Sequence, residues 1–152
     1  MALDFRPGRS DQPPGSDLLS ELIDFFNEIY PGRAARPGSV TTPDEMVPPT
    51  GTFLVGYEDG RPVAIGGLRG LENSICEIKR MYVVADARSR GVGRALLAAL
   101  EDAARGLGFE RVRLDAGPLQ MHSRALFASA GYVEIPKYND NHIADYFAEK
   151  VL

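Results

Sequence analysis

The feature that most constrains this fold is an apolar run that enters a glycine-containing loop and continues directly into a helix. Residues 78–84 are β-prone, and a helical pattern over residues 91–105 follows within a few residues. The first backbone N–H groups of such a helix lack internal partners, and the helix dipole is positive there. Glycines let the backbone approach a ligand closely, and arginines add positive charge beside it. The unit therefore predicts a cradle for phosphate or pyrophosphate.

Three phosphate-binding patterns compete for this loop. The P-loop string G-x-x-x-x-G-K-[ST] does not occur in the chain. The dinucleotide fingerprint G-x-G-x-x-G fails because Leu96 occupies its third glycine position. Asp115 is placed as a ribose ligand would be, but too little chain follows to complete a doubly wound sheet. The pattern R-x-x-G-x-G is matched by Arg88, Gly91 and Gly93.

Length and charge narrow the class of protein. The 152 residues predict one domain, and a single cysteine excludes a disulfide framework and fits a reducing compartment. The stretch 79–113 carries eight basic and four acidic residues, whereas the rest of the chain carries nine basic and seventeen acidic residues. This basic segment in a chain of net charge −4 indicates either a binding site for a small anionic ligand or a solvated helix face. We expect no nucleic-acid partner.

The N-terminal residues and the lengths of the apolar stretches bear on where the protein is located. The first 15 residues lack the apolar run of a signal peptide, and no stretch approaches the length of a membrane span. We therefore expect a cytoplasmic protein with no membrane partner.

Periodicity and turn signals predict the order of the elements. A strand over residues 3–6 precedes a helix that Ser16 or Asp17 caps and that ends near residues 31–32. Residues 52–57 and 62–68 form a hairpin around Asp59 and Gly60, and a strand over 75–84 follows. After the helix at 91–105, which Gly106 ends, we expect the remaining elements at 111–114 (strand), 121–130 (helix), 132–135 (strand) and 143–151 (strand). One turn of helix is expected after residues 42–43.

This order predicts an α/β (α+β) domain spanning residues 1–152. A strand–helix–strand unit requires a parallel pairing, whereas the hairpins are antiparallel. The central sheet is therefore expected to be mixed, mostly antiparallel and flanked by helices.

The R-x-x-G-x-G pattern resembles the acetyl-CoA-binding motif of the GNAT superfamily of N-acetyltransferases, and the Arg-Ala-Leu-Leu that follows is typical of that family. A second family landmark, N-x-x-A-x-x-x-Y-x-x-x-G-[FY], is similar to residues 120–132, with Gly131 and Tyr132 in register. The resemblance covers residues 52–138. It implies a GNAT fold, in which one parallel strand pair splays apart and the pantetheine arm of the coenzyme lies in the gap.

The resemblance implies an N-acetyltransferase that moves acetyl from acetyl-CoA to a primary amine by direct attack in a ternary complex. Its acceptor is a small molecule or a protein. The implied coenzyme-binding residues are Met81, Tyr82 and Val83 for the pantetheine amides, Arg88, Ser89, Arg90, Gly91, Val92, Gly93 and Arg94 for the pyrophosphate, and Gln120 and Phe127. The alternative is an acyl-CoA-binding sensor or interaction protein of the same fold with little transferase activity. Dimers are common in the family, so a homodimer is compatible with the resemblance.

Transfer to an amine requires a proton acceptor, because an alkylammonium has a pKa of about 10.4. Glu77 is the predicted base: it lies 11 residues before Arg88, the spacing found in the histone-acetylating branch of the superfamily. A cross-strand ion pair is the alternative role for Glu77. A strand N–H near Met81 is expected to hold the oxyanion. Cys76 is expected to be a buried apolar residue, not a nucleophile.

The sequence departs from the family pattern at two positions. Phe127 stands where many members have a tyrosine that donates to the leaving sulfur, and Gln120 replaces the family asparagine. Phe127 cannot donate a hydrogen bond, so the thiolate requires another proton source.

The acceptor pocket implied by the resemblance combines the first helix and its following loop with a late polar loop. The predicted acceptor-binding residues are Tyr30, Arg33, Arg80 and Tyr138, with Arg36 and residues 139–141 nearby. Arginines there would suit an acceptor that bears a carboxylate, whereas an acidic pocket would suit a polyamine. His122 and His142 lack partners at metal-ligand spacing, so no metal is expected.

Overall fold

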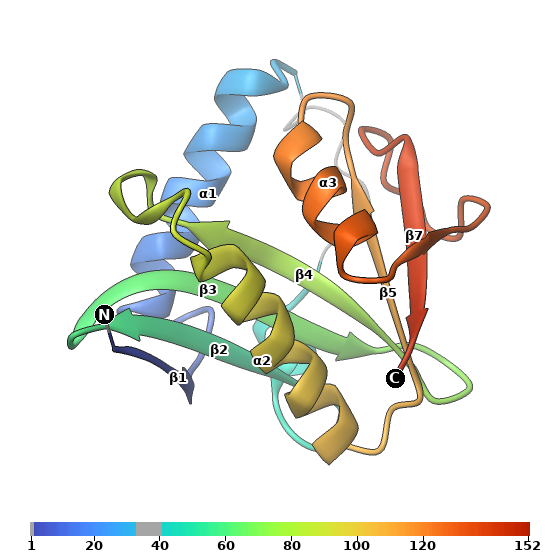
Figure 1. The fold of residues 1–152 in the computed structure, drawn as a ribbon, viewed down its shortest axis with the longest axis horizontal. Coiled ribbons are helices and arrows are strands. Elements are labelled where there is room, and N and C mark those ends of the chain that lie inside the picture. The colour runs from blue at the N-terminus through green and yellow to red at the C-terminus, as the bar shows by residue number, and fades with distance from the viewer. Residues whose placement is uncertain (1, 33–40) are drawn as a thin grey trace.

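The computed structural model describes residues 2–32 and 41–152 of the chain. Seven strands form one sheet in the order β1-β2-β3-β4-β5-β7-β6, in which β4 and β5 are parallel and the other neighbours are antiparallel (Figure 1). The strands are β1 (Leu3–Pro7), β2 (Gly51–Glu58), β3 (Arg61–Gly70), β4 (Ile75–Val83), β5 (Arg111–Ala116), β6 (Val133–Glu134) and β7 (Tyr146–Val151). The helices are α1 (Gly15–Ile29), α2 (Val92–Gly106) and α3 (Met121–Ser129), with 3-10 turns η2 (Pro43–Met46) and η3 (Ala85–Ala87). The predicted mixed, mostly antiparallel sheet is confirmed.

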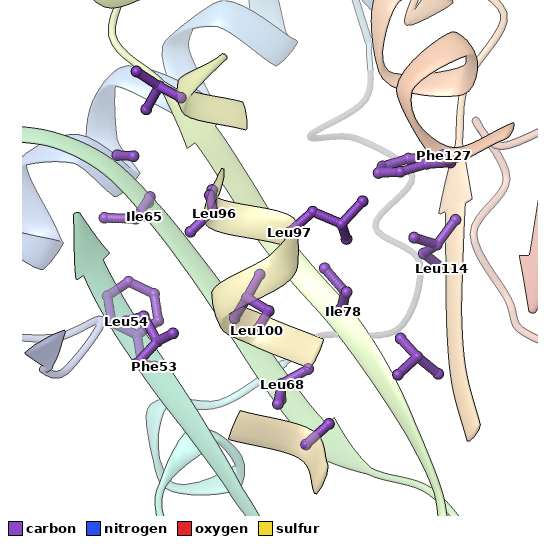
Figure 2. Close-up of a cluster of buried hydrophobic side chains, with 14 of the residues drawn as sticks. Phe53, Leu54, Ile65, Leu68, Ile78, Leu96, Leu97, Leu100, Leu114 and Phe127 are labelled. Atoms are coloured by element: carbon purple, nitrogen blue, oxygen red, sulfur yellow. The ribbon is translucent and has the colours of Figure 1, made fainter. Parts of the chain in front are cut away.

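Helices cover both faces of the sheet: α2 and α3 lie on one face and α1 lies on the other (Figure 1). Leu96, Leu97 and Leu100 of α2 point toward β3 and β4, where Leu68 and Ile78 meet them (Figure 2). All five side chains are buried, and burying one side chain of this size contributes about 1.5–3 kcal/mol. This packing fixes α2, and therefore its N-terminus, relative to β4.

The hairpin between β2 and β3 forms as the sequence predicts. Asp59 and Gly60 both have positive φ, 50° and 85°, which is the requirement of a two-residue type I′ turn.

The parallel pair β4·β5 is short. Its register covers three residue pairs, Ile75 with Arg111, Cys76 with Val112 and Glu77 with Arg113. Beyond Glu77, β4 continues for six residues while the two strands diverge toward the N-terminus of α3 (Figure 1). Arg80 adopts a φ of 62° within a register shift between β3 and β4, so a β-bulge bends β4 where the divergence begins.

Three predicted boundaries are wrong in detail. The helix α1 begins at Gly15, so Ser16 and Asp17 lie inside its first turn and make no capping hydrogen bond. The helix α2 includes Gly106 because Leu107 N still donates to Ala103 O at 3.1 Å, and the residue with positive φ (90°) is Gly108. The last strand begins at Tyr146, three residues later than expected, because turns over residues 139–143 occupy the preceding segment.

None of the helices within residues 2–32 and 41–152 is long and apolar enough to cross a membrane.

Candidate active site

The loop that enters α2 presents backbone N–H groups to an open surface. Ser89 and Gly91 adopt left-handed conformations, with φ of 64° and 82°. Gly91 is the N-cap of α2 and makes no side-chain capping hydrogen bond. The first backbone N–H groups of the helix therefore stay available as donors. A Cβ atom on Gly91 would meet nothing within 4 Å. The chain therefore leaves room above Gly91, and the N–H groups and helix dipole there suit a pyrophosphate.

The arginines of this loop contact protein groups. Arg88 Nε donates to Val83 O at 2.8 Å, and its guanidinium lies over the ring of Tyr82, 5.5 Å from the centroid. Arg90 Nη2 donates to Glu58 Oε1 at 3.0 Å, and Arg94 Nη2 donates to Ser129 Oγ at 2.8 Å. Each of these contacts holds a guanidinium through one nitrogen and sets its position beside the backbone N–H groups of the helix entrance.

The end of β4 lies beside this loop and beyond the last pair of the β4·β5 register. Tyr82 and Val83 pair with Ile65 and Ala64 of β3, so their opposite edge faces the divergence between β4 and β5. Met81, Tyr82 and Val83 are all half-buried. This is the position in which strand amides would meet an elongated ligand.

The two residues that depart from the family pattern are engaged within the protein. Gln120 Oε1 accepts a hydrogen bond of 2.7 Å from Gly117 N, immediately before α3. Phe127 is only 5% exposed and packs against Tyr132, with ring centroids 6.0 Å apart. Figure 2 shows Phe127 pointing from α3 toward Leu114 of β5. Their contacts with a coenzyme stay predictions.

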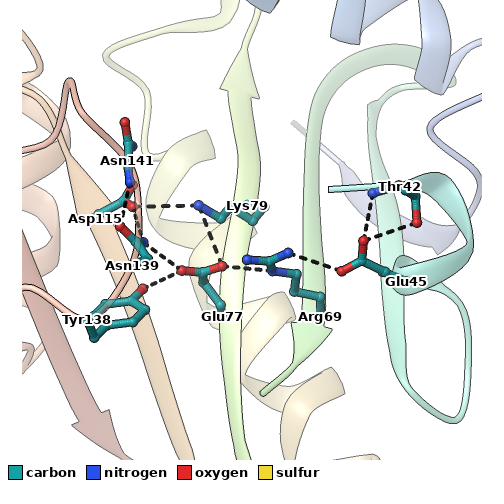
Figure 3. Close-up of polar contacts among 9 residues, drawn as sticks. All are labelled: Thr42, Glu45, Arg69, Glu77, Lys79, Asp115, Tyr138, Asn139 and Asn141. Carbon is teal, nitrogen blue, oxygen red and sulfur yellow. Dashed lines mark hydrogen bonds and ion pairs between the residues drawn. The ribbon is translucent and has the colours of Figure 1, made fainter. Parts of the chain in front are cut away.

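A buried polar network surrounds Glu77 on the strand β4 (Figure 3). Glu77 Oε1 accepts from Arg69 Nε at 2.9 Å and lies 3.5 Å from Lys79 Nζ. Glu77 Oε2 accepts from Tyr138 OH at 2.6 Å and from Asn139 Nδ2 at 3.0 Å. Four donors therefore surround one carboxylate, which is about its full acceptor capacity.

The network extends in both directions from Glu77 (Figure 3). Arg69 Nη1 reaches Glu45 Oε2 at 3.1 Å, and Glu45 also accepts from Thr42 N at the start of η2. On the other side, Asn139 Nδ2 donates to Asp115 Oδ2 at 2.7 Å, and Lys79 Nζ lies 3.6 Å from the same oxygen. The two diverging strands are thus bridged by side chains where their backbone pairing ends.

The environment sets the ionisation of Glu77 and Tyr138. Burial is the largest single influence on the pKa of Glu77 and would raise it. Lys79, the hydrogen bonds from Tyr138 and Asn139, and Arg69 together outweigh burial, so the pKa is lowered. Burial and the neighbouring Glu77 carboxylate raise the pKa of Tyr138. At neutral pH Glu77 is therefore an ionised acceptor and Tyr138 a neutral donor.

A pocket of about 330 Å³ opens beside this network at the turn between β3 and β4. Its polar lining includes Arg69, Glu77, Arg113, Tyr138, Asn139 and Asp140. Arg69 pairs with Glu77 and Glu45, and Arg113 Nε pairs with Glu149 at 2.7 Å. Because each arginine already has a carboxylate partner, the pocket wall carries no excess of positive charge.

The predicted acceptor-binding residues do not gather at one place in the structure. Tyr138 lies in the network, whereas the hydroxyl of Tyr30 accepts from Leu119 N at 3.1 Å and joins the end of α1 to the loop before α3. Arg80 is half-buried at the β-bulge. Arg33 and Arg36 lie outside the described residues.

Five members of the network were not predicted from the sequence as members of this site: Thr42, Glu45, Arg69, Lys79 and Asp115, the last of which was considered only as a ribose ligand. A signal was present, because polar residues recur at alternate positions of two apolar strands, as Glu77 and Lys79 in β4 and as Arg113 and Asp115 in β5. Alternation places such side chains on one face of the sheet.

Cys76 is fully buried, and burial raises the pKa of its thiol to about 12, which confirms its expected role as an apolar core residue. No group of three or more potential metal ligands occurs within the part of the chain that the structure describes.

The comparisons agree with this geometry. Residues 17–132 match the acetyltransferase (GNAT) family. The chain is 30% identical over 118 residues to an IAA acetyltransferase of Azospirillum brasilense. The aligned residues cover 77% of this chain and 75% of that protein. Two solved structures share the fold. One is a Klebsiella pneumoniae protein assigned to the acyl-CoA N-acyltransferases (TM-score 0.79, 23% identity, 99% and 97% of the two chains). The other is a GNAT family acetyltransferase of Elizabethkingia anophelis with acetyl-CoA bound (TM-score 0.67, 16% identity, 99% and 98%).

A sheet that splays beside an open helix N-terminus, together with these relatives, defines the protein as an acetyl-CoA-dependent acyltransferase. The chain belongs to the acetyltransferase (GNAT) family.

Proposed function

We propose that the protein transfers the acetyl group of acetyl-CoA to a primary amine of a small molecule or protein, by direct attack in a ternary complex. The observation that carries this proposal is the junction of two features: the β4·β5 register ends after three pairs, and the uncapped N-terminus of α2 lies beside the end of β4. The first feature leaves strand amides for a pantetheine arm, and the second leaves N–H donors for a pyrophosphate.

The chain's own groups would act as follows. Backbone amides of Met81, Tyr82 and Val83 hold the pantetheine, and the backbone of residues 88–94 holds the pyrophosphate. An N–H near Met81 stabilises the oxyanion that forms when the amine attacks, which is where a fixed donor contributes most. A carboxylate of the Glu77 network takes the proton of the amine, directly or through water.

Charge in the pocket bears on the acceptor. The arginines of the pocket are paired with Glu45, Glu77 and Glu149, whereas Glu72 and Asp140 are exposed at its edge. This balance favours an acceptor whose recognised end is the ammonium group itself over one held through a carboxylate.

The first experiment is calorimetric titration with acetyl-CoA, with NADH as the control ligand. We expect binding of acetyl-CoA and none of NADH. Release of CoA is then followed with a panel of monoamines, polyamines, amino acids and lysine peptides. Failure of acetyl-CoA to bind would contradict the proposal.

The second candidate is an acyl-CoA-binding sensor with little transferase activity. It is favoured by Phe127, which is buried in the core and offers no donor to a leaving thiolate. Tight acetyl-CoA binding without amine-stimulated release of CoA would support this candidate over the transferase.

A further inference from the structure

We propose that Asp115, through its Oδ1 atom, is the catalytic residue that takes the proton of the attacking amine. The inference rests on the proposed function and names the proton acceptor within the Glu77 network. It assigns Glu77 the role of a positioning residue, which fixes the groups that hold Asp115.

The position of Asp115 follows from the strand register. Arg113 is the last residue of β5 in register with β4, and Asp115 is the next residue of β5 on the same face. Lys79 has the same relation to Glu77 on β4, and its ammonium lies 3.6 Å from Asp115 Oδ2. Asp115 therefore lies where the two strands separate, at the inner end of the gap in which the acyl group would arrive.

Access distinguishes Asp115 from Glu77. The side chain of Asp115 is 11% exposed and that of Glu77 is 1% exposed. The two polar partners of Asp115 among the described residues, Asn139 Nδ2 and Lys79 Nζ, both contact Oδ2. Among the described residues no side chain donates to Oδ1, whereas both oxygens of Glu77 already accept. Asp115 thus combines the required location with an acceptor atom that can receive a proton.

The surrounding network holds Asp115 in place. Asn139 Nδ2 contacts both Asp115 and Glu77, and Asn139 Oδ1 accepts from Asn141 N at 3.0 Å, which fixes the orientation of the amide (Figure 3). Lys79 lies between the two carboxylates, with its Nζ 3.5 Å from Glu77 Oε1 and 3.6 Å from Asp115 Oδ2. A carboxylate with one oxygen held in place and the other available is suited to accept a proton.

The step balances without any further reagent. The amine nitrogen forms a bond to the carbonyl carbon of the thioester, and the carbon–sulfur bond breaks with its electron pair moving to sulfur. One proton of the nitrogen passes to Asp115 Oδ1 and then to solvent. Water supplies the proton that the CoA thiolate takes up.

The test compares Asp115→Asn with Glu77→Gln and with the surface control Asp102→Asn, an exposed carboxylate on α2. For Asp115→Asn we expect kcat/KM for the best amine of the panel to fall about 10²–10³-fold, the range for loss of a general base, with the calorimetric acetyl-CoA affinity within threefold of wild type. Asp102→Asn should equal wild type. Thermal unfolding checks the fold of each variant, and Asp115→Ser replaces Asp115→Asn if the latter does not fold.

Chemical rescue separates a base from a structural carboxylate. Formate should restore the rate of Asp115→Ala at least tenfold, because it can occupy the space left by the side chain, and should leave the rate of Glu77→Ala unchanged.

Two results would overturn the assignment. If Asp115→Asn keeps more than a third of the wild-type kcat/KM, or if formate rescues Glu77→Ala instead, Asp115 is not the base although the enzyme remains a transferase. If the wild type binds acetyl-CoA and no amine accelerates release of CoA, the proposed function fails, and this inference fails with it.

Discussion

The two ends of the gap between β4 and β5 are built from different parts of the chain. At the end near α2, the open donors are backbone N–H groups shaped by Ser89 and Gly91, while the arginine side chains contact other protein groups. At the inner end, side chains from β3, β4, β5 and the loop before β7 form a buried network around Glu77.

This difference predicts different sensitivities. A backbone cradle depends on φ and on open space, so it tolerates most side-chain changes and is sensitive to the loss of a glycine. A buried network depends on matched charge, so removal of one partner leaves other ions uncompensated. The following changes test that contrast.

The largest effect is expected from Glu77→Gln. The change removes the buried carboxylate that Arg69 and Lys79 share and leaves them with Glu45 and Asp115 as their carboxylate partners, and the loss of a buried ion pair costs about 3 kcal/mol. Urea unfolding at pH 7 measures this loss. An unfolding free energy within 0.5 kcal/mol of wild type would show that the ion pairs contribute little.

The same variant has a predicted pH dependence. The folded-state pKa of Glu77 lies below its ordinary value of 4.5, so the stability it contributes is fully present above that value and is lost as the pH falls through the folded pKa. The difference between wild type and Glu77→Gln should therefore shrink below about pH 4.5. A difference that stays constant down to pH 3 would contradict the lowered pKa.

The next effect is expected at the other end, from Gly91→Val. A branched side chain is strained at a φ of 82° and projects into the space above the helix N-terminus. We expect acetyl-CoA to bind about 30-fold more weakly, equivalent to about 2 kcal/mol. The matched control is Gly106→Ala, whose Cβ also meets nothing within 4 Å but whose backbone is helical. Calorimetry should show unchanged affinity for the control, and equal losses in both variants would contradict the cradle.

A smaller effect separates two tyrosines that donate to buried carboxylates. Tyr138 donates to Glu77 at 2.6 Å. Tyr132 donates to Glu101, a residue of α2, at 2.8 Å. Each change to phenylalanine should cost about 1.5 kcal/mol, the lower range for a hydrogen bond to a charged group. Steady-state kinetics should show a raised acceptor KM for Tyr138→Phe alone. A similar rise for Tyr132→Phe would mean that general destabilisation causes it.

The smallest effect is expected for Arg90→Gln. Because the guanidinium of Arg90 contacts Glu58 and lies on the surface, acetyl-CoA affinity at 0.15 M salt should change by less than about threefold. A loss of more than tenfold would show that Arg90 leaves Glu58 to bind the coenzyme, and that the cradle is not mainly backbone.

Most of the fold could be predicted from the sequence because its signals are local. Alternation, helical periodicity and the Asp59-Gly60 turn place the hairpin, α2 and the single parallel pairing correctly. The end of α2 was predicted one residue early, because Gly106 is still helical and Gly108 is the glycine that takes the left-handed conformation. The start of β7 was missed because Asn139 and Asn141 accept hydrogen bonds from nearby backbone and form turns in a stretch that otherwise suits a strand.

The candidate site was predictable in its backbone part and less so in its side chains. The glycine pattern marks the loop, but nothing local shows that Arg90 turns to Glu58, a residue 32 positions away. Likewise, the partners of Glu77 come from three segments, β3, β4 and the loop before β7, that only the folded sheet brings together. Long-range register decides these contacts, and a single sequence does not contain it.

The three residue pairs that join β4 to β5 have a consequence for the whole molecule. They make the sheet two half-sheets, β1–β4 and β5–β7–β6, connected by a narrow seam. Under the proposed function, the coenzyme completes that seam by taking hydrogen bonds that a longer strand pairing would otherwise make. A ligand at one hundred times its Kd adds about 2.7 kcal/mol to the unfolding free energy. The resistance of this chain to heat and to proteases would then follow the supply of its own acyl donor.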